Sequence, residues 1–164
     1  MRMGAVLVAG VIAAMLAGTT FAGGMNMPMR GSEHFIYGHP GPGSGPVQMI
    51  HIRAFDDLRF QPAHIAVTRG ETVKFVVTNM GKLAHEFVIG DAAEQAAHEK
   101  EMQAVLGMVM KHDVNGISLP PGQTRDLVWT FTRDGTVEYA CHDPGHFAAG
   151  MVGKIVIVSP RHHG

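Results

Sequence analysis

The chain has 164 residues, with 13 Lys or Arg against 14 Asp or Glu, so its formal net charge is −1 at pH 7. A balance this close to neutral excludes the basic surface that binds nucleic acid and the polybasic patch that binds anionic membranes. The unusual feature is 11 His and 12 Met beside a single Cys, which are side chains that bind metal ions.

Residues 1–22 have the pattern of a secretory signal peptide. Arg2 precedes the apolar run from Met3 to Leu16, and the ending Thr20-Phe21-Ala22 predicts cleavage after Ala22. An uncleaved anchor is the alternative, but the apolar stretch is short for a membrane span and is interrupted by glycines. We therefore expect an exported protein, located in the periplasm, with no stable membrane insertion after cleavage.

Residues 23–46 are rich in Gly, Pro and Met and have no hydrophobic periodicity, which predicts a flexible tail. From residue 47 to residue 158 the chain instead shows short β-branched and aromatic runs between turn residues. This pattern predicts one all-β domain, a Greek-key β-sandwich or barrel, followed by a C-terminal tail at 159–164. The expected strands are 47–54, 64–67, 72–78, 86–89, 124–131, 136–140 and 154–158.

One segment of the domain departs from the strand pattern. Residues 91–113 begin with a run of helix formers in which Ala and Glu predominate, and they contain no β-branched residue before Val105. We expect this segment to be a helical insert between two strands.

The only cysteine opens a loop of metal-binding side chains. Cys141, His146 and Met151 follow one another at C-x4-H-x4-M spacing, with turn residues between the first two. His85 stands at the entry of a predicted strand and can supply a second imidazole. A thiolate, two imidazoles and a weak thioether form the ligand set of a copper site used for electron transfer.

The sequence of this loop gives less support to other metal sites or to catalysis. Zinc also binds Cys and two His, but its structural sites close with a stronger fourth ligand than a thioether. A trinuclear oxidase centre needs a His on each side of the cysteine, and position 140 is Ala140; a binuclear bridged site needs two cysteines. Nucleophilic Cys/His catalysis needs a third orienting group, which nothing in the sequence marks.

Two segments carry a family resemblance. The run Leu83-Ala84-His85-Glu86-Phe87 and the loop from Cys141 to Met151, leading into residues 153–158, resemble the cupredoxin superfamily of blue copper proteins, which includes plastocyanin, azurin and rusticyanin. A narrower resemblance is to exported bacterial cupredoxins associated with copper tolerance. The resemblance covers residues 47–158 and implies one type 1 copper per domain, with His85, Cys141, His146 and Met151 as ligands.

The resemblance implies one-electron transfer by a protein that is not itself an enzyme. A redox partner, such as a cytochrome, an oxidase or a reductase, is expected to dock near His146, where Pro144, Gly145, Phe147 and Ala148 form an apolar rim. The alternative is a periplasmic copper-tolerance protein that binds, buffers or oxidises copper, and this reading leaves an oxidase-like activity on copper open.

Further His and Met residues are candidates for accessory copper ions, because thioethers favour Cu(I) and imidazoles accept either state. The candidates in the tail and the insert are Met25, Met27, Met29, His34, His39, His98, Met102, Met108, Met110 and His112. A compositional accident in the tail and packing of the insert Met residues against the sandwich are the alternatives. His51, His64 and His142 are expected to be structural, with His142 facing away from Cys141 at the surface or core edge.

Overall fold

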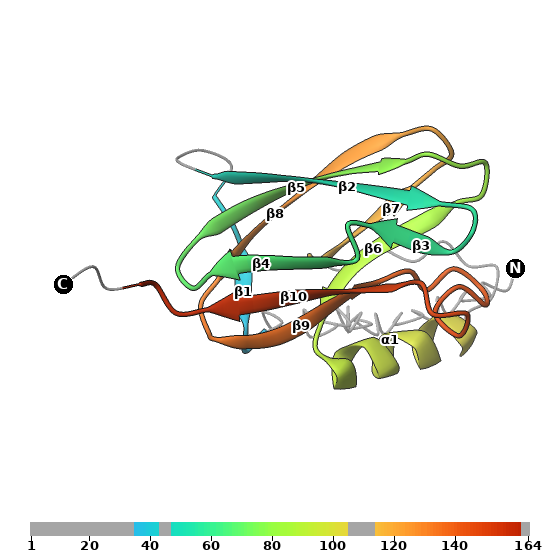
Figure 1. Cartoon of the computed structure of the whole chain (residues 1–164). Helices are drawn as coiled ribbons and strands as arrows, with labels where there is room; N and C mark the ends of the chain where they lie inside the picture. The colour runs from blue at the N-terminus through green and yellow to red at the C-terminus, as the bar shows by residue number, and fades with distance from the viewer. Residues whose placement is uncertain (1–34, 43–46, 105–113, 162–164) are drawn as a thin grey trace, which may run out of the picture. The chain divides into compact units, whose positions relative to one another are not determined.

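Two β-sheets of five strands each form the body of the protein in the computed structural model, which describes residues 35–42, 47–104 and 114–161 (Figure 1). The first sheet has the order β1 (Gly38–Pro40), β8 (Thr124–Phe131), β5 (Thr72–Asn79), β2 (Gln48–Phe55) and β3 (Arg59–Gln61). The second has the order β4 (His64–Thr68), β10 (Val152–Val158), β9 (Gly135–Ala140), β6 (His85–Gly90) and β7 (Gly116–Leu119). The predicted all-β sandwich is confirmed.

The chain crosses between the sheets. β2 pairs with β5 and β4 pairs with β10 in parallel, whereas the other ladders are antiparallel. Parallel neighbours need a crossover connection, and here each crossover runs through a strand of the opposite sheet. All the strands predicted from the sequence occur, with ends that differ by a residue or two.

Alternating side chains of the strands build the core between the sheets. In β5, Val73, Phe75 and Val77 are buried while the residues between them are part-exposed, which is the period of two of a strand with one inward face. Full burial of a large apolar side chain contributes about 1.5–3 kcal/mol to folding. The largest of these fully buried side chains are Trp129, Tyr139, Phe75, Phe87 and Phe131.

Part of the predicted tail belongs to the sandwich. Phe35 and Tyr37 are buried, and their rings lie 5.2 Å and 5.7 Å from the ring of Trp129. The Tyr37 hydroxyl donates a hydrogen bond to the Ile89 carbonyl at 2.9 Å. The prediction of a flexible tail over 23–46 is therefore wrong for residues 35–42, because two aromatic side chains anchor a stretch whose average composition is polar and Gly-rich.

The three short strands β1, β3 and β7 were not predicted. β1 consists of Gly38, His39 and Pro40, and Gly and Pro are depleted in strands. Gly38 is needed there, because a Cβ would lie 2.2 Å from the Thr130 carbonyl oxygen. Strands of three or four residues are too short to show a periodic pattern, so only their pairing reveals them.

The helical insert is confirmed over α1 (Ala92–Ala104), and residues 105–113 lie outside the described residues. Asp91 caps the helix: its Oδ1 accepts the N–H groups of Ala93 and Glu94, and Glu94 Oε2 accepts the N–H of Asp91. Gln95 is buried and its side-chain amide donates to the carbonyls of Val88 in β6 and Glu138 in β9. These bonds hold the helix against the second sheet.

Three connections meet at one end of the sandwich. They are the β2–β3 turn (56–58), the β5–β6 loop (80–84) and the β9–β10 loop (141–151), and the first and last lie at the right of Figure 1. Asp56 in the turn accepts backbone N–H groups of the β5–β6 loop. Glu86, just after that loop, donates its N–H to the sulfur of Cys141. This end positions the predicted ligands.

Candidate metal centre

Three of the four predicted ligands meet at this end of the sandwich. The sulfur of Cys141 lies 3.9 Å from Nδ1 of His85 and 3.2 Å from Nδ1 of His146. The ligand atoms of the three residues all lie within 4.8 Å of one another, and the two imidazole rings are 5.1 Å apart. Within the part of the chain that the structure describes, no other three His, Cys, Asp or Glu side chains gather this closely.

Two of these three predicted ligands lie at the ends of strands. His85 is the first residue of β6, where it pairs with Leu119 of β7, and Cys141 directly follows the last residue of β9. The sulfur and the first imidazole are 56 residues apart in sequence. They meet because β6 and β9 are antiparallel neighbours, with Val88 opposite Ala140.

The β9–β10 loop folds back on itself and so returns to its starting point. The N–H of His146 donates to the Asp143 carbonyl, and Gly145 and Gly150 adopt positive φ angles of 84° and 88° that favour glycine. Met151 then donates its N–H to the His146 carbonyl, and its own carbonyl accepts the N–H of Cys141. The loop thus joins the three residues of the C-x4-H-x4-M motif by backbone hydrogen bonds.

Met151 is completely buried beside Cys141 and His146 in the backbone hydrogen-bond network of the loop. Its side chain belongs to the core cluster of the sandwich. Its role as the axial ligand remains a prediction.

Burial controls the protonation of the site. Burial raises the pKa of the Cys141 thiol to about 12, against the smaller opposing effect of the Glu86 N–H, which donates to the sulfur at 3.2 Å. Burial also lowers the pKa of His85, which is completely shielded from solvent at its side chain. The imidazole is therefore neutral, the form that binds metals, and the thiol needs a metal ion to become a thiolate.

The donor set fits copper. One thiol and two imidazole nitrogens converge, and the residue that closes the loop offers a thioether rather than a fourth strong donor. A closed tetrahedral zinc site uses four thiolate, imidazole or carboxylate ligands, so this arrangement favours copper over zinc. Asp143 is the nearby carboxylate, and its Oδ2 lies 3.8 Å from the sulfur as the acceptor of the thiol proton.

His142 faces away from the ligands, as expected, but it is not at the surface. It is 1% exposed, its Nδ1 lies 2.8 Å from Glu99 Oε2, and its Nε2 lies 2.7 Å from Gln95 Oε1. Phe147 stacks on its ring with the centroids 4.7 Å apart. Sequence alternation predicted the side of the strand correctly, but it contained no signal that α1 covers that side.

The accessory copper candidates do not form a second centre where the structure describes them. His39 is exposed on β1, with Nδ1 2.9 Å from the Pro40 carbonyl oxygen. His98 is half-buried with its ring 4.8 Å from that of His142, and Met102 is half-buried one turn further along α1. His51 and His64 are exposed. The candidates Met25, Met27, Met29, His34, Met108, Met110 and His112 lie outside the described residues.

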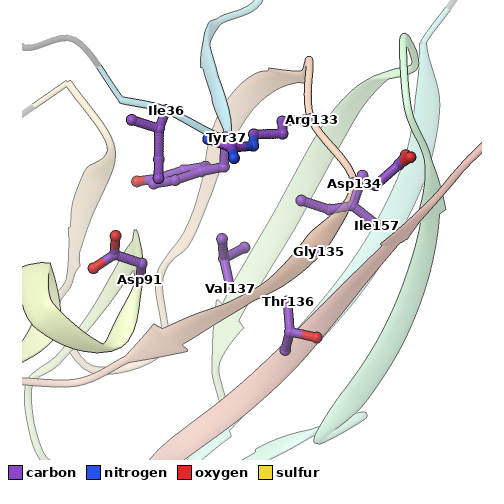
Figure 2. Close-up of a pocket in the computed structure, with 9 residues that line it drawn as sticks. All are labelled: Ile36, Tyr37, Asp91, Arg133, Asp134, Gly135, Thr136, Val137 and Ile157. Atoms are coloured by element: carbon purple, nitrogen blue, oxygen red, sulfur yellow. The ribbon is translucent and has the colours of Figure 1, made fainter.

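A pocket of about 230 Å³ lies at the other end of β9 (Figure 2). Gly135 and Thr136 at the start of that strand line it, together with Tyr37, and its charged groups come from Asp91, Arg133 and Asp134. Cys141 follows the opposite end of the same strand. The pocket is therefore separate from the candidate metal centre.

Comparison with known proteins points to the same chemistry. Residues 48–158 match the family of copper binding proteins, plastocyanin/azurin family. The copper-resistant cuproprotein CopI of Rubrivivax gelatinosus is 44% identical over 121 residues, which cover 74% of this chain and 73% of that protein. The copper-resistant cuproprotein CopI of Pseudomonas aeruginosa is 36% identical over 149 residues, covering 74% and 82%.

A solved structure confirms the fold class independently. Reduced auracyanin from Roseiflexus castenholzii superposes with a TM-score of 0.61 at 23% identity, over 70% of this chain and 99% of that one. None of the helices in the described ranges is both long and apolar enough to cross a membrane. With a family match over residues 48–158 and CopI relatives of this similarity, the chain belongs to the plastocyanin/azurin family of copper-binding proteins, the cupredoxins, and is related to the CopI copper-resistance proteins.

Proposed function

We propose that this protein holds one copper ion in a type 1 site and transfers one electron at a time. The observation that carries the proposal is the convergence of the Cys141 sulfur with the Nδ1 atoms of His85 and His146 at one end of a rigid sandwich. Met151 is the proposed axial ligand. Copper in such a site supplies a one-electron redox couple, and the protein itself is not an enzyme.

The chain contributes rigidity and exclusion of water. Cys141 and Met151 are fully buried, and His85 is 1% exposed, so three of the proposed ligands are held by packed surroundings. The Glu86 N–H donates to the sulfur and helps to fix its position. A site held in this way rearranges little between oxidation states, which favours rapid electron transfer.

A redox partner is proposed to dock over His146, the one ligand that is part-exposed. Pro144, Gly145 and Ala148 are exposed around it, and Phe147 is part-exposed, so the rim is small and apolar. Such a rim suits a transient contact with a cytochrome, an oxidase or a reductase, because weak electron-transfer interfaces are small. The proposed location of the encounter is the periplasm, after removal of residues 1–22.

The first test is addition of one equivalent of Cu(II) to the protein that begins at Gly23, followed by visible absorption and electron paramagnetic resonance. The expected result is intense thiolate-to-copper absorption and a type 1 resonance. A pale spectrum of ordinary Cu(II) would overturn the proposed site. Zinc at equal concentration is the competitor, and preferential zinc retention would move the assignment to a structural zinc site.

A second candidate role is copper tolerance, which the names of the two CopI relatives favour. In this role the protein binds, buffers or oxidises periplasmic copper, with the Met-rich stretch before the domain collecting further ions. Copper stoichiometry distinguishes the two roles. One ion per chain supports an electron carrier, and several ions, reduced to one when Met25, Met27 and Met29 are changed to Leu, support a buffer.

The structure decides how that stoichiometry experiment must be designed. A deletion that extends to His39 would remove Phe35 and Tyr37 from the core and so confound loss of copper with loss of folding. The side-chain changes leave those two aromatic residues in place. Copper sensitivity of a deletion strain with intact respiration would support tolerance; impaired respiration without copper sensitivity would support electron transfer.

A further inference from the structure

The Nε2 atom of His85 is buried, and the candidate metal centre does not account for it. Nδ1 faces the Cys141 sulfur, whereas Nε2 points away from the centre, is shielded from solvent and has no hydrogen-bond partner. A neutral imidazole that binds a metal through Nδ1 carries its proton on Nε2. A buried N–H without an acceptor is unfavourable, so a nearby acceptor has a defined role.

Asp56 is the candidate for that acceptor. Its Oδ1 lies 3.6 Å from His85 Nε2, at the distance of an ion pair and slightly beyond that of a hydrogen bond. The two residues come from different elements, since Asp56 lies in the turn after β2 and His85 begins β6. Metal-binding histidines characteristically direct their second ring nitrogen at a carboxylate, a backbone carbonyl or water.

The carboxylate of Asp56 is held firmly in that place. Both of its oxygens accept the N–H of Lys82, at 3.0 Å and 2.9 Å, and Oδ1 also accepts the N–H of Leu83 at 3.1 Å. Gly81 leaves room for it, because a Cβ at that position would lie 1.8 Å from Oδ1. The backbone hydrogen bonds also lower the pKa of Asp56, which keeps it ionised.

The loop that carries this contact is itself fixed. Asn79 is fully buried, its Oδ1 accepts the N–H of Gly81, and its Nδ2 donates to the carbonyls of Leu83 and Leu119. The neighbouring acid differs, because Asp57 pairs with Arg59 at 2.8 Å in an exposed ion pair. The loop thus binds one of two adjacent carboxylates and directs it at the imidazole.

We propose that Asp56 is a positioning residue of the metal centre, which accepts the Nε2–H of His85, fixes Nδ1 as the ligating nitrogen and stabilises Cu(II) relative to Cu(I) by its negative charge. This inference rests on the proposed copper site, in which His85 is a ligand. Partners of this kind change metal affinity by about 10–100-fold when they are mutated.

The test compares Asp56→Asn with Asp57→Asn. Each variant removes one carboxylate charge, and the two positions are adjacent in the sequence. Only Asp56→Asn removes the charge that lies beside His85, because Asp57 pairs with Arg59. In Asp56→Asn, an amide oxygen in the Oδ1 position retains the bonds from Lys82 and Leu83. The expected result is a fall of about tenfold in Cu(II) over Cu(I) affinity, which is a rise of about 59 mV in reduction potential. Asp57→Asn is expected to stay near wild type.

Equal potentials in the two variants would overturn the inference. Gly81→Ala is the second variant, because its methyl group displaces the carboxylate while both charges remain. It is expected to raise the potential in the same direction as Asp56→Asn. If Gly81→Ala folds, as a native far-ultraviolet circular dichroism spectrum would show, and its reduction potential is unchanged, the position of the Asp56 carboxylate does not affect the copper site. That result would contradict the inference.

A readout without copper separates this inference from the proposed function. In the copper-free protein, imidazole proton–nitrogen correlation spectra are expected to show His85 protonated at Nε2, with a slowly exchanging proton that is lost in Asp56→Ala and kept in Asp57→Asn. Protonation at Nδ1 instead would overturn the inference. If the wild-type protein fails to give a type 1 spectrum with copper, the proposed function fails, and this measurement still decides whether Asp56 orients the ring.

Discussion

Two clusters of histidine lie on opposite sides of the end of β9, and only one of them is suited to bind a metal. On the ligand side, the ring nitrogens of His85 and His146 face a sulfur atom. On the helix side, both ring nitrogens of His142 contact oxygen atoms of α1, at 2.7 Å and 2.8 Å. Cys141 belongs to the first environment and the next residue, His142, to the second. Both residues are buried.

The difference shows that the partners of an imidazole, rather than its burial, decide whether it can be a ligand. Glu99 and Gln95 already occupy the nitrogens of His142, so a metal ion would have to break two short contacts. The helix side instead joins α1 to His142, two residues after the end of β9. We interpret its contacts as purely structural. The following substitutions test whether the ligand side binds copper and the helix side only stabilises the fold.

The largest expected effect is that of Cys141→Ser on the ligand side. The hydroxyl group replaces the soft sulfur donor, so the thiolate-to-copper absorption is expected to disappear completely and any bound Cu(II) to give an ordinary resonance. Visible absorption after addition of Cu(II) measures this. Retained colour would remove Cys141 from the ligand set.

Met151→Leu is expected to keep copper and colour but to raise the reduction potential. Loss of a weak thioether donor destabilises Cu(II) more than Cu(I), and a tenfold change in relative affinity corresponds to about 59 mV. Leu has a similar volume, so the fully buried position tolerates the change. Spectroelectrochemical titration gives the potential, and a value equal to that of wild type would mean that the thioether makes no axial contact.

The smallest effect on copper is expected on the helix side, from His142→Leu. The substitution leaves Gln95 Oε1 and Glu99 Oε2 without their partner, so the free energy of unfolding is expected to fall by about 1–3 kcal/mol while the type 1 spectrum is kept. Urea unfolding of the copper-free protein measures the loss. His51→Leu, at an exposed position of β2, is the control and is expected to change stability by less than about 0.5 kcal/mol. A His142→Leu protein that folds but no longer binds copper would assign His142 to the metal side.

Local patterns explain why much of the centre was predictable. The loop places Cys141, His146 and Met151 within one short motif, and backbone hydrogen bonds inside the loop bring its ends together. The longer strands were predictable because buried apolar side chains alternate with more exposed ones when one face of a strand points into the core, as in β5. The short strands β1 and β7 and the aromatic anchors of residues 35–37 were missed, because a pairing partner or a packing partner defines them.

By itself, the sequence determined the all-β class, the helical insert and the spacing of three predicted ligands on a single loop. Only the tertiary structure decided that His142 lies beneath α1, that Phe35 and Tyr37 complete the core, and that Asp56 faces His85. The physical reason is the range of the interactions. Periodicity and spacing report which residues are buried or adjacent along the chain, whereas the group that covers a buried atom comes from another strand, helix or loop.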